Sequence, residues 1–103
     1  MKYSAITAMI ARRDILEAAR YIAEKLHNSS AAGRLLDELE DAINSLEEMP
    51  HRHSLVEDEY LASRGIRFLP IRNYLAFYVV REESKTVVIV RVLYTRRNWL
   101  SIL

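Results

Sequence analysis

The chain has 103 residues, half of them hydrophobic, and a formal net charge of +1 at pH 7. We expect a chain of this length to form one domain, residues 1–103, around a single modest core. Because cysteine is absent, a disulfide framework and a thiolate metal site are excluded; because no apolar run approaches the roughly 18 to 20 residues that span a bilayer, we expect a cytoplasmic protein without a membrane segment.

The first half of the chain predicts a short strand followed by two helices. Residues 2–6 can form a strand, and Thr7 is a suitable N-cap for a helix that runs to about Leu26. A second helix is predicted over residues 32–46, where apolar side chains recur at helical spacing, and a proline ends it. The break at residues 27–30 is short and rich in capping residues, so the two helices are expected to form an antiparallel hairpin.

The second half changes to a period of two. After a polar loop over residues 51–65, three strands rich in aromatic and β-branched residues are predicted at 66–71, 75–81 and 86–93. The connections are short enough to be hairpin turns, and residues 99–103 can form a helical stub. The predicted fold is α+β in the order strand, helix, helix, strand, strand, strand. Its helical hairpin packs on one face of an antiparallel meander.

Charge is distributed unevenly along the chain. Residues 29–63 carry two basic and nine acidic side chains, whereas residues 64–103 carry eight basic and two acidic ones. Such segregation is typical of a surface that binds nucleic acid or an acidic protein, although a solvated acidic helix face explains the middle segment equally well. Most basic side chains of the last segment are arginines, which suit bidentate contacts to phosphate. We therefore expect the functional surface in residues 64–103.

Two arginines interrupt apolar rows on the predicted strands. Strict alternation places Arg91 on the same face as Ile89 and opposite Val90 and Val92, and it places Arg67 in the apolar row of its own strand. A charge in an apolar row is unfavourable unless it is paired or lies near the wet edge of the sheet. The two arginines therefore either pair with acidic residues of the second helix or point across the sheet at phosphates.

A second group of candidates surrounds the end of the last strand. Arg96 and Arg97 follow Tyr94 in a segment with no apolar pattern, and Trp99 lies just beyond them. Together with Arg72 in the first hairpin turn, these residues are predicted to bind a nucleic acid or another target, because aromatic rings on a sheet can stack on unpaired bases. The alternative is that the aromatic side chains belong to the core.

Signatures of metals and cofactors are weak or missing. His51 and His53, with Glu57 and Asp58 nearby, have no third ligand fixed by spacing, so solvated loop histidines explain them better than a metal site. The sequence has no glycine-rich phosphate loop, nucleophile elbow or paired-carboxylate signature. We expect neither a metal nor a cofactor.

Several short motifs, in this order and at these spacings, resemble the RelE/ParE superfamily of toxins from bacterial type II toxin–antitoxin modules. The resemblance covers nearly the whole chain and implies the same order of a strand, two helices and a meander. The motifs are Tyr21-Ile22-Ala23, Ala31-Ala32, Glu48-Met49-Pro50, Gly65-Ile66-Arg67, Asn73-Tyr74-Leu75-Ala76-Phe77-Tyr78 and Arg91-Val92-Leu93-Tyr94-Thr95-Arg96-Arg97-Asn98-Trp99.

This resemblance implies a small cytoplasmic toxin of a plasmid-stabilization module. Such a toxin inhibits growth until a cognate antitoxin wraps around it in a hetero-oligomer. The superfamily divides by target. RelE-like members cut messenger RNA on the ribosome without a metal, using basic residues that stabilise charge on the phosphate, whereas ParE-like members poison DNA gyrase and are not nucleases.

Residue by residue, the chain matches the nuclease pattern only in part. RelE-like nucleases carry an arginine directly after the tyrosine of the middle strand, where this chain has Leu75. Arg67 stands where they carry lysines and Arg91 matches an arginine of the last strand, so these two are the candidate catalytic residues. A rearranged nuclease would use both for phosphate and Tyr94 or His53 for proton transfer. The resemblance slightly favours the ParE-like or uncharacterised branch; an mRNA endoribonuclease and a non-toxic nucleic-acid-binding module are the alternatives.

Overall fold

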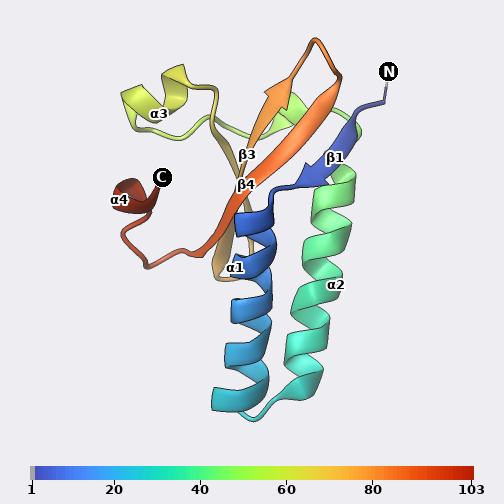
Figure 1. Ribbon diagram of the computed structural model, residues 1–103, viewed down its shortest axis with the longest axis vertical. Coiled ribbons are helices and arrows are strands. Elements are labelled where there is room, and N and C mark those ends of the chain that lie inside the picture. Colours follow the sequence, from blue (N-terminus) through green and yellow to red (C-terminus); the bar gives the residue numbers. More distant parts are fainter. Residues whose placement is uncertain (1) are drawn as a thin grey trace.

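The computed structural model describes residues 2–103 and contains a four-stranded sheet with helices on both faces (Figure 1). The strand order is β1-β4-β3-β2, in which β1 runs parallel to β4 and the other neighbours are antiparallel. The predicted α+β class and element order are confirmed, with one helix added. Within residues 2–103, none of the helices combines the length and the apolar composition of a membrane span. The elements are β1 (Ser4–Thr7), α1 (Met9–Arg20), the π-helical turn η1 (Tyr21–Lys25), α2 (Ser29–Ser45), the 3-10 turn η2 (Pro50–Arg52), α3 (Glu59–Ser63), β2 (Arg67–Ile71), β3 (Tyr74–Arg81), β4 (Thr86–Tyr94) and α4 (Trp99–Ile102).

The α1–α2 hairpin covers one face of the sheet. At the start of α2, the side-chain oxygen of Asn28 accepts a hydrogen bond from the Ala31 N–H at 3.0 Å, which satisfies one of the unpaired donors of the first turn. The apolar stripe of α2 then packs on the sheet, and burial of each large side chain contributes about 1.5 to 3 kcal/mol. The centre of this first core consists of Leu35, Leu39, Ile43, Leu46, Tyr78, Val87 and Ile89.

The helix α1 begins later than predicted, and the helical backbone reaches the predicted end near Leu26 through a π-helical turn. Thr7 pairs with Ile89 in the sheet, and Ala8 takes the N-cap position without a side-chain cap. Because the Ala8 N–H donates to the Ile89 carbonyl at 3.0 Å, the strand pairing delays the helix by one residue. At the other end, the Leu26 N–H bonds to the carbonyl of Tyr21, five residues earlier, and makes the turn π-helical. The hairpin projects well beyond the end of the sheet (Figure 1).

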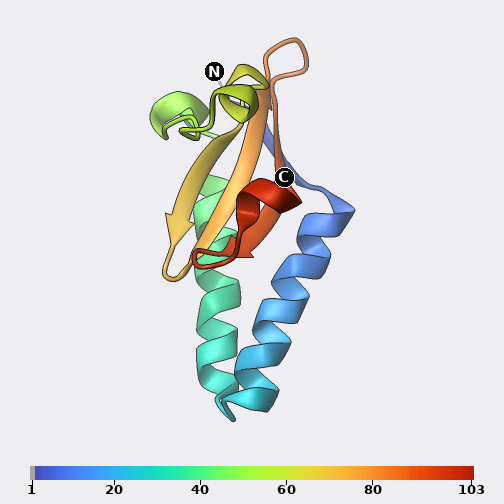
Figure 2. The same cartoon turned by 90° about the vertical axis from the view of Figure 1, so that its left-hand side faces the viewer.

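The other face of the sheet is covered by α3 and α4, which lie on the side away from the hairpin (Figure 2). The second core there includes Phe77 and Leu93, both fully buried. Residues 51–65, predicted to be a polar loop, also contain most of η2 and all of α3. The carboxylate of Asp58 caps α3 by accepting from the Leu61 N–H at 3.0 Å. With five residues, α3 is too short to produce a periodic apolar pattern.

The strand β4 does not alternate along its whole length. Ile89 and Arg91 lie opposite consecutive residues of β3, so Val90 is an extra residue in a β-bulge. The prediction that Val90 and Val92 share a face is therefore wrong, since Val90 packs in the second core and Val92 in the first. Because β1 ends opposite Ile89, the bulge lies where β4 loses its outer neighbour. It directs Arg91 toward this open edge.

Candidate functional site

Arg91 is held by a carboxylate of α1. Its Nε donates to Oδ2 of Asp14 at 2.7 Å, and its Nη2 donates to Oδ1 at 2.9 Å. The Val92 N–H also donates to Oδ2, at 3.0 Å. The side-chain hydrogen bonds to Asp14 raise the pKa of Arg91. Arg91 thus has an acidic partner, but the prediction that this partner belongs to the second helix is wrong.

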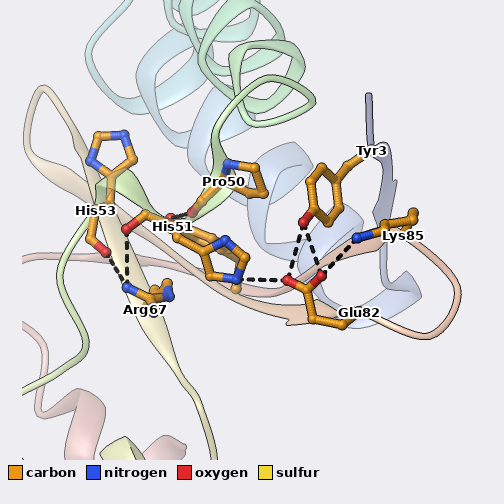
Figure 3. Close-up of polar contacts among 8 residues, drawn as sticks. Tyr3, Pro50, His51, His53, Arg67, Glu82 and Lys85 are labelled. Carbon is orange, nitrogen blue, oxygen red and sulfur yellow. Dashed lines mark hydrogen bonds and ion pairs between the residues drawn. The ribbon is translucent and has the colours of Figure 1, made fainter. Parts of the chain in front are cut away.

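Arg67 has carbonyl partners instead of an acidic one. Its Nη1 donates to the carbonyl oxygen of His53 at 2.7 Å and to that of His51 at 3.3 Å (Figure 3). The alternative in which Arg67 pairs with an acidic residue of the second helix is therefore wrong too. Its guanidinium holds the segment after α2 against the end of the sheet.

The side chains of the two predicted catalytic arginines project from opposite faces of the sheet. Arg67 pairs with Tyr78, which belongs to the first core, and Arg91 pairs with Phe77, which belongs to the second. Directly paired residues of antiparallel strands point to the same face. The structure therefore does not bring Arg67 and Arg91 together at one phosphate.

Arg72, in the turn between β2 and β3, is engaged by α2. Its Nε donates to Oε1 of Glu38 at 2.8 Å, and its Nη2 donates to Oε2 of the same carboxylate. This side-chain bond lowers the pKa of Glu38 and raises the pKa of Arg72. The pair joins the turn to the helical hairpin.

A groove of about 580 Å³ lies between the projecting end of the hairpin and the end of β4. We call it the tyrosine groove, because its walls carry Tyr21 from η1, Tyr74 from β3 and Tyr94 from β4. The rings of Tyr74 and Tyr94 meet edge to face with centroids 5.6 Å apart, and burial raises the pKa of Tyr74. Leu26, 58% exposed, and Arg97 also line it. The groove is thus aromatic and apolar, with few charges.

Arg96 and Arg97 follow β4 in an exposed turn. Neither forms an ion pair with any carboxylate of residues 2–103. Trp99 differs from them, because its half-buried ring packs on Phe77 with centroids 5.2 Å apart. The structure therefore exposes the two arginines to a partner and assigns Trp99 to the packing of α4.

A further polar cluster surrounds Glu82 at the turn between β3 and β4 (Figure 3). Its carboxylate accepts from the Tyr3 hydroxyl at 2.9 Å and from Nζ of Lys85 at 3.1 Å, and it lies 2.8 Å from Nε2 of His51. The hydrogen bonds from Lys85 and Tyr3 lower the pKa of Glu82. One exposed carboxylate thus connects the segment before β1, η2 and the β3–β4 turn.

The two loop histidines face different surroundings. His51 contacts Glu82, whereas burial and then the charge of Arg52 lower the pKa of His53. In the described part of the chain, no three histidine, aspartate or glutamate side chains gather closely enough to hold a metal.

Asp14 and Glu82 organise these contacts, and neither was singled out from the sequence. Asp14 did leave a signal: it stands between Ala11 and Ala18 on the buried face of α1, where an acidic residue indicates a paired partner. Glu82 left none, because it lies in a polar turn where no periodicity separates a hydrogen-bonded carboxylate from a solvated one.

Comparisons with known proteins give one family and several solved structures with a similar fold, among them chains from two toxin–antitoxin systems. Residues 8–99 match the family model described as the ParE toxin of the type II toxin–antitoxin system parDE. No curated protein sequence matches the chain. The crystal structure of the toxin–antitoxin complex RelBE2 from Mycobacterium tuberculosis contains a similar chain, with a TM-score of 0.62 and 25% identity over 91% of this chain and 99% of that one. A chain of the chromosomal ParDE toxin–antitoxin system from P. aeruginosa has the same fold, with a TM-score of 0.76 and 15% identity over 92% and 98%.

Proposed function

The chain belongs to the ParE toxin family of type II toxin–antitoxin systems, and we propose that it is a cytoplasmic toxin that arrests bacterial growth until a cognate antitoxin binds it. The family match spans residues 8–99, so the sequence resemblance to the RelE/ParE superfamily is confirmed. Both structural relatives come from toxin–antitoxin systems, which supports an antitoxin as the partner. On this proposal residues 1–103 form a single toxin domain.

The tyrosine groove is the proposed seat of an antitoxin segment. Tyr21 and Leu26 are 49% and 58% exposed on its hairpin wall. Exposed apolar side chains of this kind are typical of a surface that a partner protein covers. Besides Asp14, which is already in an ion pair, the lining carries one charge of each sign, on Glu17 and Arg97. We therefore expect an amphipathic segment whose apolar side chains enter the groove while its polar face stays in solvent. The product is a toxin–antitoxin hetero-oligomer.

Gyrase inhibition is proposed over RNA cleavage, and the Asp14–Arg91 pair carries this choice. A guanidinium that forks onto a buried carboxylate cannot offer the same N–H groups to a phosphate. Arg67 is turned to the other face of the sheet and donates to carbonyl oxygens. Leu75 stands where the nucleases of the superfamily carry an arginine. These contacts support a ParE-like inhibitor without a catalytic phosphate clamp.

Growth arrest and rescue test the toxin and its groove together. Induction of the chain alone should stop bacterial growth, and co-expression of the adjacent open reading frame should restore it. The variants Tyr21→Glu and Leu26→Glu should remain toxic but escape rescue, because a buried carboxylate in the groove is unfavourable for the antitoxin. Leu36→Glu is the matched control: Leu36 is an exposed apolar residue of the hairpin that does not line the groove, so this variant should still be rescued. Normal growth with a verified, folded product would contradict the proposal.

The target is tested with purified components. Inhibition of gyrase supercoiling by the chain is expected, and Arg96→Ala should weaken it about tenfold because this exposed cation is proposed to contact the enzyme. Arg34→Ala, an exposed arginine of α2, is the control and should inhibit as the wild type does. Mapped transcript ends should show no codon-phased cuts after induction. Phased cuts that disappear in Arg91→Ala would establish the nuclease alternative instead.

A further inference from the structure

A second hollow, of about 670 Å³, lies on the sheet face opposite the α1–α2 hairpin. It is bounded by β3 and β4, by α3 and α4, which lie on the same side of the sheet in Figure 1, and by Ile10 at the start of α1. Three arginines from different elements line it, and the half-buried side chains of Val79 and Val90 form apolar parts of its surface. We call it the arginine hollow; its cations are Arg64 of α3, Arg81 of β3 and Arg91 of β4.

The first two of these cations are available to a ligand. Arg64 donates from Nη1 to the Tyr60 hydroxyl at 3.1 Å, and its guanidinium lies 5.9 Å from the centre of that ring. Neither Arg64 nor Arg81 is within ion-pair distance of a carboxylate in residues 2–103. Glu83 is the one acidic side chain among the lining residues of this part of the chain. Two guanidinium groups of the hollow are therefore outside any ion pair of the described residues, and the cations of its lining outnumber the one carboxylate there.

The lining indicates which anion fits. Guanidinium groups match the geometry of phosphate oxygens, to which they donate paired hydrogen bonds. Tyr60 is 65% exposed at the side of the hollow and presents a ring on which a planar group can stack. The volume lies within the usual range of small-molecule sites, about 300 to 1,000 Å³. A simple anion would leave the valine surface and the ring unused.

We propose that the arginine hollow binds a nucleoside phosphate, with Arg64 and Arg81 on the phosphate and the base against Tyr60 and the valines. The nucleoside phosphate is either a free nucleotide or the phosphorylated end of a nucleic-acid strand. This site does not rest on the toxin activity. Arg91 lines the hollow and its partner Asp14 lines the tyrosine groove, so their ion pair separates the two cavities. An antitoxin segment and a nucleoside phosphate are therefore expected to bind together.

Titration of the purified chain with GMP, AMP, inorganic phosphate and an acidic peptide tests the proposal by calorimetry. Saturable binding is expected for a nucleotide, with inorganic phosphate weaker. Arg64→Gln and Arg81→Gln should each weaken nucleotide binding about tenfold, the effect of one charge-assisted hydrogen bond. Arg34→Gln is the matched control, because Arg34 is exposed on α2 and lies outside the hollow. All three side chains are exposed, so the folded state is expected to be retained.

The remaining outcomes decide the source of the ligand or refute the site. A nucleic-acid end is identified as the ligand if a 5′-phosphorylated tetranucleotide binds more tightly than GMP and more tightly than the same tetranucleotide with a 5′-hydroxyl. Equal weakening by Arg34→Gln would mean non-specific attraction to a basic chain and would overturn the proposal. The absence of saturable nucleotide binding would also overturn it. So would binding of the acidic peptide without binding of any nucleotide.

Discussion

Asp14 and Glu82 are both carboxylates that collect donors from distant parts of the chain, but they do so in opposite surroundings. Asp14 joins α1 to β4, and its side chain is 7% exposed. Glu82 joins the β3–β4 turn to Tyr3 and His51, and its side chain is 50% exposed. Water can replace the partners of Glu82, whereas nothing replaces the partners of Asp14. Similar hydrogen bonds are therefore expected to contribute very differently to the free energy of unfolding at the two positions.

The difference also separates rigid from adjustable parts of the molecule. The Asp14–Arg91 pair forms the wall between the tyrosine groove and the arginine hollow, so both cavities depend on its geometry. The cluster around Glu82 instead holds exposed segments at the far end of the sheet (Figure 3). We expect substitutions at the first position to change folding and function together, and substitutions at the second to change neither strongly.

Removal of the buried carboxylate has the largest expected effect. Asp14→Ala leaves the Arg91 guanidinium and the Val92 N–H without their partner, so the free energy of unfolding should fall by about 3 kcal/mol. Urea unfolding followed by circular dichroism measures it. Asp37→Ala, an exposed acidic residue of α2, should stay within about 0.5 kcal/mol of the wild type. Equal effects of the two substitutions would mean that Asp14 is as dispensable as a surface charge.

A double-mutant cycle isolates the pair from its surroundings. Asp14→Asn keeps an acceptor for the Val92 N–H and removes the charge, and Arg91→Met keeps much of the apolar stem. The two substitutions should show a coupling free energy of about 2 kcal/mol, because each one alone leaves an unpaired group in a poorly solvated place. The exposed Arg72–Glu38 pair provides the comparison, and its cycle should show a clearly smaller coupling because water screens both groups. Additive effects at Asp14 and Arg91 would contradict this account.

The regular elements were predictable because their burial is periodic. The stripe from Ala32 to Leu46 repeats with the helical period, the β-branched run in β4 alternates up to the bulge, and both elements form as expected. Thr7 was wrongly assigned to the helix start because strand pairing with Ile89 competes with capping. The bulge at Val90 follows from where β1 ends, a tertiary fact that no local pattern contains.

The candidate sites were predictable only as a list of residues. The sequence places Arg67 and Arg91 on strands, but their faces and partners depend on the bulge and on α1. The sequence gives no signal for Arg64 and Tyr60, because α3 is a single short helix in a polar loop. Side chains that meet across the fold leave no spacing signal, so both cavities had to come from the structure.

The smallest expected effect is that of Glu82→Gln, and its pH dependence gives the sharpest test of the contrast. Hydrogen bonds from Lys85 and Tyr3 depress the pKa of Glu82 in the folded state below the ordinary value of 4.5. A depressed carboxyl pKa adds stability that is complete above the ordinary value and is lost as the pH falls through the depressed one. At pH 7 the thermal midpoint of Glu82→Gln should therefore lie slightly below that of the wild type, and the difference should close on acidification. It should also shrink in 1 M salt, where the screening length is about 3 Å. A large, salt-independent difference would mean that the Glu82 cluster is as structural as the Asp14–Arg91 pair.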